Sequence, residues 1–407
     1  MILPLYQGGI FMFRSIRSNY EHTIYAGYIG YITQAVVNNF APLLFLTFAG
    51  QYGLTLDKIT LITTINFCVQ LCVDLLSAKV MDRIGYRRGI IGAHLFAALG
   101  LLGMAFLPEL FGNAYAGLLA AVVLYAIGGG IIEVLISPII ESCPTKKKEA
   151  AMSLLHSFYC WGHVFVVLAS TAFFYFFGIG SWKILACIWA LVPLFNLFYF
   201  SLVPLYPVTG EHEELSVRGL FGQRIFWLFM IIMVCAGASE QAMSQWASAF
   251  AESGLRVSKT VGDLAGPCAF ALLMGTSRAL YAKCSDRLPL KRFMKLSAVL
   301  CIACYLIAVF SGAAVVGLLG CALCGFSVGI FWPGTFSIAA GRLPGGGTAM
   351  YAFMALAGDV GCSAGPTVVG MVANAMGGNL KAGLFTAMIF PILILLGISL
   401  LRDQNKG

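Results

Sequence analysis

The sequence predicts an all-α polytopic membrane protein with twelve transmembrane helices in two pseudo-symmetric six-helix bundles. Three observations support this fold class. Hydrophobic residues make up 60% of the 407-residue chain and charged residues only 10%, whereas about a quarter of an average soluble domain is charged. The apolar residues form runs of the roughly 20 residues that an α-helix needs to cross a bilayer. A short motif at the end of the second run recurs at the end of the eighth.

The apolar runs fall into two groups of six, separated by a polar stretch. Residues 1–204 are predicted as the N-terminal bundle, 205–222 as a cytoplasmic linker and 223–407 as the C-terminal bundle. The runs do not alternate in polarity at every second residue, as the strands of a membrane β-barrel would. The predicted spans are 21–49, 58–80, 90–107, 115–140, 150–178, 183–204, 223–251, 260–283, 293–311, 314–341, 348–376 and 382–401.

Positive charge predicts the orientation of these spans. If the N-terminus is cytoplasmic, 19 of the 25 Lys and Arg residues fall in inside segments, five fall in outside segments, and Arg278 lies within a span. Because short loops rich in Lys and Arg stay on the cytoplasmic side, both termini are predicted to be cytoplasmic. The location predicted for this multi-pass protein is the cell (inner, cytoplasmic) membrane, with the lipid bilayer as its partner.

The composition also excludes several classes of function. The Lys and Arg residues form short clusters between apolar runs and no basic stripe with interleaved aromatics, so the net charge of +8 predicts no nucleic-acid partner. The sequence has no P-loop for ATP and shows no nucleophile–base pair, so we expect no enzyme activity and no catalytic residue. Most of the 13 cysteines lie inside apolar runs and are interpreted as small core residues, and no metal site is expected.

The motif that recurs is Ala-Lys-x-x-Asp-Arg. It covers residues 78–83 and 282–287, an offset of 204 residues, about half of the chain. This repeat predicts that the two bundles arose by duplication. Parallel halves of this kind are one of the plans on which secondary transporters are built, with the substrate site near the membrane midplane between the halves.

The first copy continues as Asp82-Arg-Ile-Gly-Tyr-Arg-Arg88, which resembles the Asp-Arg-x-Gly-Arg-Arg/Lys loop motif of the major facilitator superfamily. With twelve spans and a half-chain repeat, the resemblance covers the whole chain and implies the major facilitator fold. It also implies that the loop is a latch in which acidic and basic side chains pair with each other and with helix ends. A loop that only orients the protein is the alternative. The residues assigned to this gating motif are Asp74, Asp82, Arg83, Gly85, Arg87, Arg88, Asp286 and Arg287.

A narrower resemblance lies in the fourth and fifth spans. Residues 129–138, with Glu133 before Ser137-Pro138, are similar to the Gly-x-x-Glu-x-x-x-Asn-Pro segment of the fucose–proton symporter family, and residues 154–162 are similar to its Leu-x-Gln-x-Phe-Asn-x-x-Gly. The resemblance implies that Glu133 carries the coupled proton. The chain departs from the family at Ser137, His156, Tyr159 and Asn38, where the family has Asn, Gln, Asn and Asp. These departures leave the solute open.

Glu133 also attracts attention on physical grounds. It lies eight residues before Glu141, at the predicted cytoplasmic end of the span, and eight residues of helix extend about 12 Å. A charged carboxyl group near the middle of a membrane costs free energy, so its presence there indicates a function. It is expected to hold a proton while sealed from water and to release it when water enters; the alternative is a hydrogen-bonded packing residue. His156 and His163 on the next span could form a relay with it or could be satisfied buried histidines.

Two polar helix faces suggest a ligand. The first span carries Tyr31, Gln34 and Asn38 with Asn39 beside them, and the seventh carries Glu240, Gln241, Gln245 and Trp246. Amide groups hydrogen-bond in both directions and aromatic faces stack on sugar carbons, so these faces suit a neutral polyhydroxylated solute. Polar packing between helices is the alternative. The residues predicted to bind substrate are Gln34, Asn38, Asn39, His156, Tyr159, His163, Glu240, Gln241, Gln245, Trp246, Arg278 and Trp332.

The remaining charges within spans are candidates for coupling. Asp74 and Arg278 occupy equivalent positions, each eight residues before the loop Asp of its own half. Arg278 could pair with Asp74, Glu240 or Asp359, or could hold an anionic group of the substrate. Asp359, in a glycine-rich stretch of span eleven that should pack closely or bend, is predicted as a second proton-coupling group beside Glu133. A kink is predicted at Trp332-Pro333, and it would turn this Trp toward a cavity or into the core.

These features predict a secondary active transporter that takes up a small polar solute with a proton by alternating access, and that acts as a monomer. The favoured solute is a sugar or sugar derivative, which makes the prediction one of symport and sugar transport. No cofactor is expected apart from the proton as the coupling ion. The alternative is a proton-driven exporter of drugs or metabolites, which would share the loop motif; a non-transporting receptor on the same fold would bind without flux.

Overall fold

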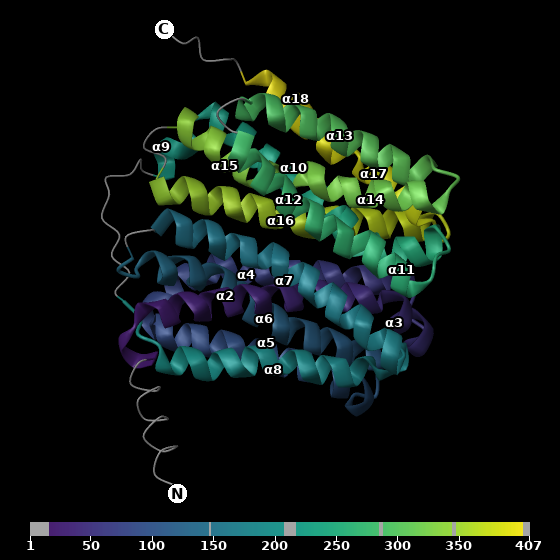
Figure 1. The fold of residues 1–407 in the computed structure, drawn as a ribbon, viewed down its shortest axis with the longest axis horizontal. Helices are drawn as coiled ribbons and strands as arrows, with labels where there is room; N and C mark the ends of the chain where they lie inside the picture. Colours follow the sequence, from purple (N-terminus) through teal and green to yellow (C-terminus); the bar gives the residue numbers. More distant parts are fainter. Residues whose placement is uncertain (1–15, 146–147, 207–216, 285–287, 344–346, 402–407) are drawn as a thin grey trace, which may run out of the picture. The chain divides into compact units, whose positions relative to one another are not determined.

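The computed structural model of the chain describes residues 16–145, 148–206, 217–284, 288–343 and 347–401, and all regular elements in these ranges are helices (Figure 1). Eleven segments of the described chain form helices that are long and apolar enough to cross a membrane. The remaining predicted span, 260–283, is present as three consecutive helical pieces. The predicted all-α class is therefore confirmed.

The helices match the predicted spans closely. In the first half they are α2 (Tyr20–Asn39), η1 (Ala41–Leu44), α3 (Phe45–Tyr52), α4 (Leu56–Ile84), α5 (Tyr86–Leu110), α6 (Ala114–Glu141), α7 (Lys148–Phe177), η2 (Ile179–Ser181) and α8 (Trp182–Leu202). In the second half they are α9 (Val217–Phe221), α10 (Arg224–Ala249), η3 (Phe250–Gly254), α11 (Lys259–Asp263), η4 (Leu264–Cys268), α12 (Ala269–Cys284), α13 (Leu290–Phe310), α14 (Ala314–Val328), α15 (Phe331–Arg342), α16 (Gly347–Ala375), α17 (Leu380–Ala387) and α18 (Ile389–Leu400).

Local sequence signals explain where several helices begin and break. Asparagine caps α2, α6 and α17: the side-chain oxygens of Asn19, Asn113 and Asn379 accept hydrogen bonds from backbone N–H groups of the first turn, which would otherwise have no acceptor. The predicted kink of span ten is confirmed, because the helix stops after Val328 and α15 resumes just before Pro333. A proline has no N–H to give to the carbonyl four residues earlier.

The internal repeat is visible in the structure. Helix α5 begins at residue 86 and α13 at residue 290, which reproduces the 204-residue offset of the motif. Arg87 donates hydrogen bonds to three backbone carbonyls at the end of α8, and the equivalent Lys291 donates to the Leu401 carbonyl at the end of α18. A cation at a helix C-terminus meets carbonyls that lack partners and the negative end of the helix dipole. The first turns of α5 and α13 thus each bind the end of the last helix of their own half.

The chain divides into two compact units. The first comprises Met1–Phe40, Cys72–Val166 and Phe177–Glu211, and the second comprises Ala41–Leu71, Val167–Phe176 and His212–Gly407. The second unit therefore includes parts of the first half of the chain, namely η1, α3, the first part of α4 and the last part of α7. The bundle boundaries at 204 and 223 stay a prediction.

Glycines allow helices to pack closely in both units. In the first unit, a Cβ atom at Gly100 of α5 would lie 2.3 Å from the backbone nitrogen of Tyr125 in α6. In the second unit, a Cβ atom at Gly361 of α16 would lie 1.9 Å from the backbone oxygen of Val234 in α10. Both distances are too short for any side chain, so the backbones of these helix pairs are in contact. Close packing of span eleven is therefore confirmed.

Candidate functional site

The acidic group predicted to carry a proton has a defined partner in the first unit. Glu133 lies on α6, and its Oε2 atom accepts a hydrogen bond of 2.9 Å from Nε2 of Gln34 on α2. Gln34 is only 3% exposed. Two side chains that the sequence singled out on different helices are thus brought together.

A second contact ties the same two helices. The hydroxyl groups of Tyr31 and Ser137 lie 3.2 Å apart, and both residues lie one turn away from Gln34 and Glu133 on their own helices. Small residues of α2 permit this approach: a Cβ atom at Gly30 would lie 2.1 Å from Cδ1 of Ile136. The polar face of α2 and the acidic face of α6 therefore form one hydrogen-bonded seam.

The other candidates of the first unit have less defined surroundings. Asn38 is buried on α2, whereas Asn39 is occupied locally, since its Nδ2 atom donates to the Ala35 carbonyl at 2.9 Å. On α7, Tyr159 is half-buried and His163 is buried. The side chain of His156 lies outside the described residues. The ligand-contact roles of these residues stay predictions.

One aromatic pair also belongs to this region. The rings of Tyr28 on α2 and Phe158 on α7 are stacked, with centroids 4.3 Å apart and planes inclined by 7°. An aromatic face of this kind suits the apolar side of a sugar ring. Neither residue belongs to the motifs recognised in the sequence, although Tyr28 lies three residues before Tyr31 on the same helix.

In the second unit, the amide groups predicted on span seven form a hydrogen-bonded chain along α10. Nε2 of Gln245 donates to Oε1 of Gln241 at 3.0 Å, and Nε2 of Gln241 donates to Oε1 of Glu240 at 3.3 Å. The guanidinium of Arg278 on α12 interacts electrostatically with the Glu240 carboxyl. Of the partners considered for Arg278, Glu240 is thus one that the structure supports.

Arg278 also replaces a backbone hydrogen bond that is missing at the kink in span ten. Its Nε atom donates to the Gly329 carbonyl at 3.0 Å. That carbonyl lies four residues before Pro333, which has no N–H to offer it. Arg278 therefore fastens α12 to the break between α14 and α15.

The tryptophan candidates lie in helix packing of the second unit. Trp246 is fully buried, and its Nε1 atom donates to the Pro366 carbonyl at 2.9 Å. The ring of Trp332 packs against Gly358 on α16, where a Cβ atom would lie 2.2 Å from the ring. Asp359 follows directly on the same helix. Substrate contact by either Trp and proton coupling by Asp359 stay predictions.

The loop motif is described in part. Gly85 has φ +85°, a conformation that favours glycine, and it makes the turn between α4 and α5. Arg87 binds the end of α8 as stated above, Arg88 is exposed, and Asp74 is half-buried on α4. The side chains of Asp82 and Arg83, and residues Asp286 and Arg287 altogether, lie outside the described residues.

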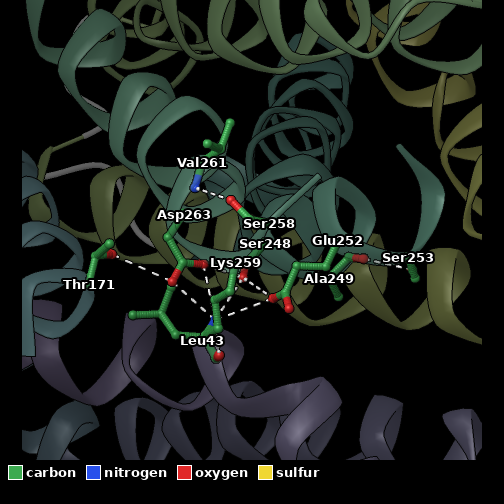
Figure 2. A network of polar contacts seen from close by, with 10 residues as sticks. All are labelled: Leu43, Thr171, Ser248, Ala249, Glu252, Ser253, Ser258, Lys259, Val261 and Asp263. Carbon is green, nitrogen blue, oxygen red and sulfur yellow. Dashed lines mark hydrogen bonds and ion pairs between the residues drawn. The ribbon is translucent and has the colours of Figure 1, made fainter. Parts of the chain in front are cut away.

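Sequence reasoning missed one polar centre. Lys259, Asp263 and Glu252 are joined by ion pairs in the second unit (Figure 2). Lys259 is one of the five cations that the charge pattern places in outside segments, and the sequence motifs select neither acid. A Lys and an Asp four residues apart at the start of an apolar run were the available signal. Among the described residues, no group of three His, Cys, Asp or Glu side chains could hold a metal ion.

Several solved structures of transporters have a similar fold. A bacterial homologue of the human lysosomal transporter Spinster, inward-facing and occupied, has a TM-score of 0.76 at 14% identity and covers 94% of this chain and 97% of its own. A D-xylose–proton symporter has a TM-score of 0.75 at 14% identity, with 93% and 95% covered. The transporter FucP in its outward conformation has a TM-score of 0.63 at 16% identity, with 94% and 99% covered.

Sequence comparison gives the family. No curated protein matches the chain. The sequence profile of the Major Facilitator Superfamily, however, matches residues 27–366, most of the chain. This match agrees with the helical architecture, the half-chain repeat and the loop between α4 and α5. The protein is therefore a multi-pass membrane transporter that belongs to the major facilitator superfamily.

Proposed function

We propose that this transporter takes up a small polar solute, most specifically a neutral sugar or sugar derivative, together with a proton. The observation that carries the proposal is the hydrogen bond between Glu133 and Gln34 in the seam between α2 and α6. The proposed location is the cell membrane, with both termini in the cytoplasm. The proposed functional unit is a monomer. The proton is the coupling ion, and no other cofactor is invoked.

Glu133 is suited to the coupling role by its surroundings. It lies in a membrane-spanning helix, where an unpaired carboxylate is expensive, and Gln34 is the neighbour that donates to it. An amide that donates one hydrogen bond stabilises a carboxylate without neutralising it. A proton can therefore bind when the site is sealed from water and leave when water reaches it, which links proton movement to alternating access.

The polar groups near the charges support a neutral, hydroxylated solute. The seam of α2 and α6 offers hydroxyl and amide groups, the Tyr28–Phe158 pair offers stacked rings, and α10 offers two amides next to Glu240. Such groups can donate to and accept from sugar hydroxyls. The D-xylose–proton symporter and FucP are similar to this chain in fold, and so is the nucleoside transporter NupG. A nucleoside is thus a further polar solute to be tested.

Transport direction separates uptake from the alternative of export. The purified protein is reconstituted into liposomes, and an inward proton gradient is imposed. Entry of labelled D-xylose, L-fucose or uridine is then measured. Accumulation above the outside concentration, abolished by a protonophore, is the expected result for at least one solute. Proton-driven exit without accumulation would favour the exporter.

Variants identify the coupling residue. Glu133→Gln keeps the shape of the side chain and a hydrogen-bonding partner for Gln34, so it should retain counterflow exchange and lose accumulation. Glu109→Gln is the matched control, because Glu109 is 65% exposed and pairs with Lys183 at the surface. It should accumulate solute as the unmodified protein does.

A further inference from the structure

We propose that Glu252, Lys259 and Asp263 form a second proton-binding site, in which Glu252 carries the proton and Asp263 stays ionised. The inference rests on the proposed proton-coupled function and adds a site to it that is separate from Glu133. Figure 2 shows the contacts of this centre, in which Asp263 is buried and the other two side chains are half-buried.

Asp263 is surrounded by hydrogen-bond donors. Its carboxylate is fully buried and accepts hydrogen bonds from Lys259 at 3.0 Å, from the Ser248 hydroxyl at 2.5 Å and from the Thr171 hydroxyl at 3.5 Å. Three donors, one of them an ammonium group, stabilise the charged form of a carboxyl group. Asp263 is therefore the ionised partner of Lys259.

Glu252 has weaker hydrogen-bond donors than Asp263. Lys259 donates to its Oε1 atom at 3.3 Å, and the Ser248 hydroxyl lies 3.4 Å from the same atom. A hydroxyl has one hydrogen to donate, and the shorter bond commits that of Ser248 to Asp263. Lys259 is thus the remaining donor to Glu252. The two carboxyl groups differ enough in their partners for a proton to prefer Glu252.

With both acids ionised, the centre carries a net negative charge. One ammonium and two carboxylates leave one negative charge uncompensated. The ionisable side chains in contact with Asp263 are Lys259 directly and Glu252 through Lys259, whereas Arg256 in the same loop is exposed. A buried charge without a partner is strongly unfavourable. A single proton removes it, and Glu252, which is 21% exposed, can receive that proton from water.

Contacts with the first half of the chain link this centre to movement of those segments. Lys259 also donates to the Leu43 carbonyl at 2.7 Å, and Thr171 belongs to α7. These two partners come from the first half of the chain, whereas Lys259, Asp263 and Glu252 come from the second. Leu43 lies in the short helix η1, where Pro42 interrupts the regular helix of the first span. The centre therefore closes only when segments of both halves meet within the second unit.

The backbone around the centre is irregular in the same place. Glu252 lies in the π-helical turn η3, and Asp263 directly precedes a second π-helical turn, η4. Arg256, between them, has φ +59°, which is uncommon for a residue other than glycine. Widened turns redirect side chains and are frequent at functional sites. Here they direct both acids toward one lysine.

The direction of the effect follows from the charge. With a proton on Glu252 the centre is neutral, which favours the closed, dehydrated arrangement. Without the proton the remaining negative charge favours an arrangement in which Lys259 leaves Leu43 and water enters. Proton binding at this centre should therefore accompany its closure, and proton release should accompany its opening.

Infrared difference spectroscopy of the purified full chain between alkaline and acidic buffer tests the inference without a substrate. A carboxyl group that takes up a proton gains a carbonyl stretching band, which shifts in D₂O. Among the bands, one should be lost in Glu133→Gln and a different one in Glu252→Gln. Glu109→Gln, the exposed matched control, should keep both.

Two further variants sharpen the test. Asp263→Asn leaves one lysine and one glutamate, which neutralise each other, so the Glu252 band should also disappear. Lys259→Gln removes the cation, so the carboxyl signal of the centre should grow. A Glu252 band that is absent from the unmodified protein, or that is unchanged in Asp263→Asn, would overturn the second site. Solute accumulation that survives in Glu133→Gln would instead overturn the proposed role of Glu133, whatever the Glu252 band does.

Discussion

At the residue scale, Arg278 has two tasks: it fastens α12 to the break in span ten and balances the charge of Glu240. Its guanidinium donates through Nε–H to the Gly329 carbonyl and also interacts with Glu240, and a compact ammonium group does not reproduce both contacts. We expect Arg278→Lys to lower the free energy of unfolding by about 1 kcal/mol, the typical contribution of one hydrogen bond. Thermal unfolding of the purified variant and of the unmodified protein measures this loss of stability.

The electrostatic task of Arg278 can be isolated by a double-mutant cycle. Arg278→Gln leaves Glu240 without its cation and should destabilise the protein more than Arg278→Lys does. Adding Glu240→Gln removes the unbalanced charge, so the double variant should regain part of the loss. Additive effects of the two substitutions would show that Arg278 and Glu240 do not interact.

The seam between Glu133 and Gln34 illustrates how far single residues could be predicted. The sequence indicated both side chains, because amides and carboxyl groups within spans need partners. It could not indicate that they touch, because the rotation of α2 against α6 is decided by packing of Gly30 on Ile136. Lys259 was missed for a different reason: its charge fitted the count of outer loop residues, and its burial depends on chain segments far away in the sequence.

At the element scale, the equivalent cations of the two halves should differ in their contribution to stability. Arg87 donates through a guanidinium to the carbonyls of Phe200, Ser201 and Val203 at 2.8–3.2 Å, whereas Lys291 donates through an ammonium group to the Leu401 carbonyl. We expect Arg87→Gln to lower the free energy of unfolding by about 1.5–3 kcal/mol, the range for hydrogen bonds to charged groups. Lys291→Gln should cost less.

The neighbouring Arg88, which is exposed, provides the control for this comparison. Arg88→Gln should leave the unfolding temperature unchanged within error, since it removes a positive charge from the same loop without removing a helix cap. Equal losses in the Arg87 and Arg88 variants would contradict capping and would favour a general effect of loop charge.

The contact between α10 and α16 gives a second prediction for elements. A Cβ atom at Gly361 would overlap the Val234 carbonyl, so Gly361→Ala must push the helices apart and should destabilise the protein by about 1–3 kcal/mol. Gly92→Ala is the control, because a Cβ atom at Gly92 on α5 meets nothing within 4 Å. It should stabilise the helix by about 0.5–1 kcal/mol. Thermal unfolding that ranks the two variants the other way would contradict the packing.

The helices themselves were the most predictable feature. Apolar runs end where charged residues begin, so the twelve predicted spans agree with the helices to within a few residues. The break before Pro333 followed from a missing N–H. The π-helical turns η3 and η4 did not, because no sequence pattern distinguishes a wide turn from a regular one; η3 contains Glu252 and η4 directly follows Asp263.

At the scale of the whole molecule, membership in the superfamily explains the half-chain repeat, the twelve spans and the loop between α4 and α5 together. The solute and the coupling ion are a finer matter, because superfamily members of one fold differ in the few side chains that line their sites. Glu133 is the group on which the proposed coupling depends.

Solute-driven proton movement tests that dependence most directly. Liposomes that contain the protein and a trapped pH indicator, with equal pH on both sides, receive the solute that the uptake screen selects. The expected result is acidification of the interior by the unmodified protein and by Glu109→Gln, and none by Glu133→Gln although that variant still exchanges labelled solute. Acidification by Glu133→Gln at the rate of the unmodified protein would contradict the proposed coupling.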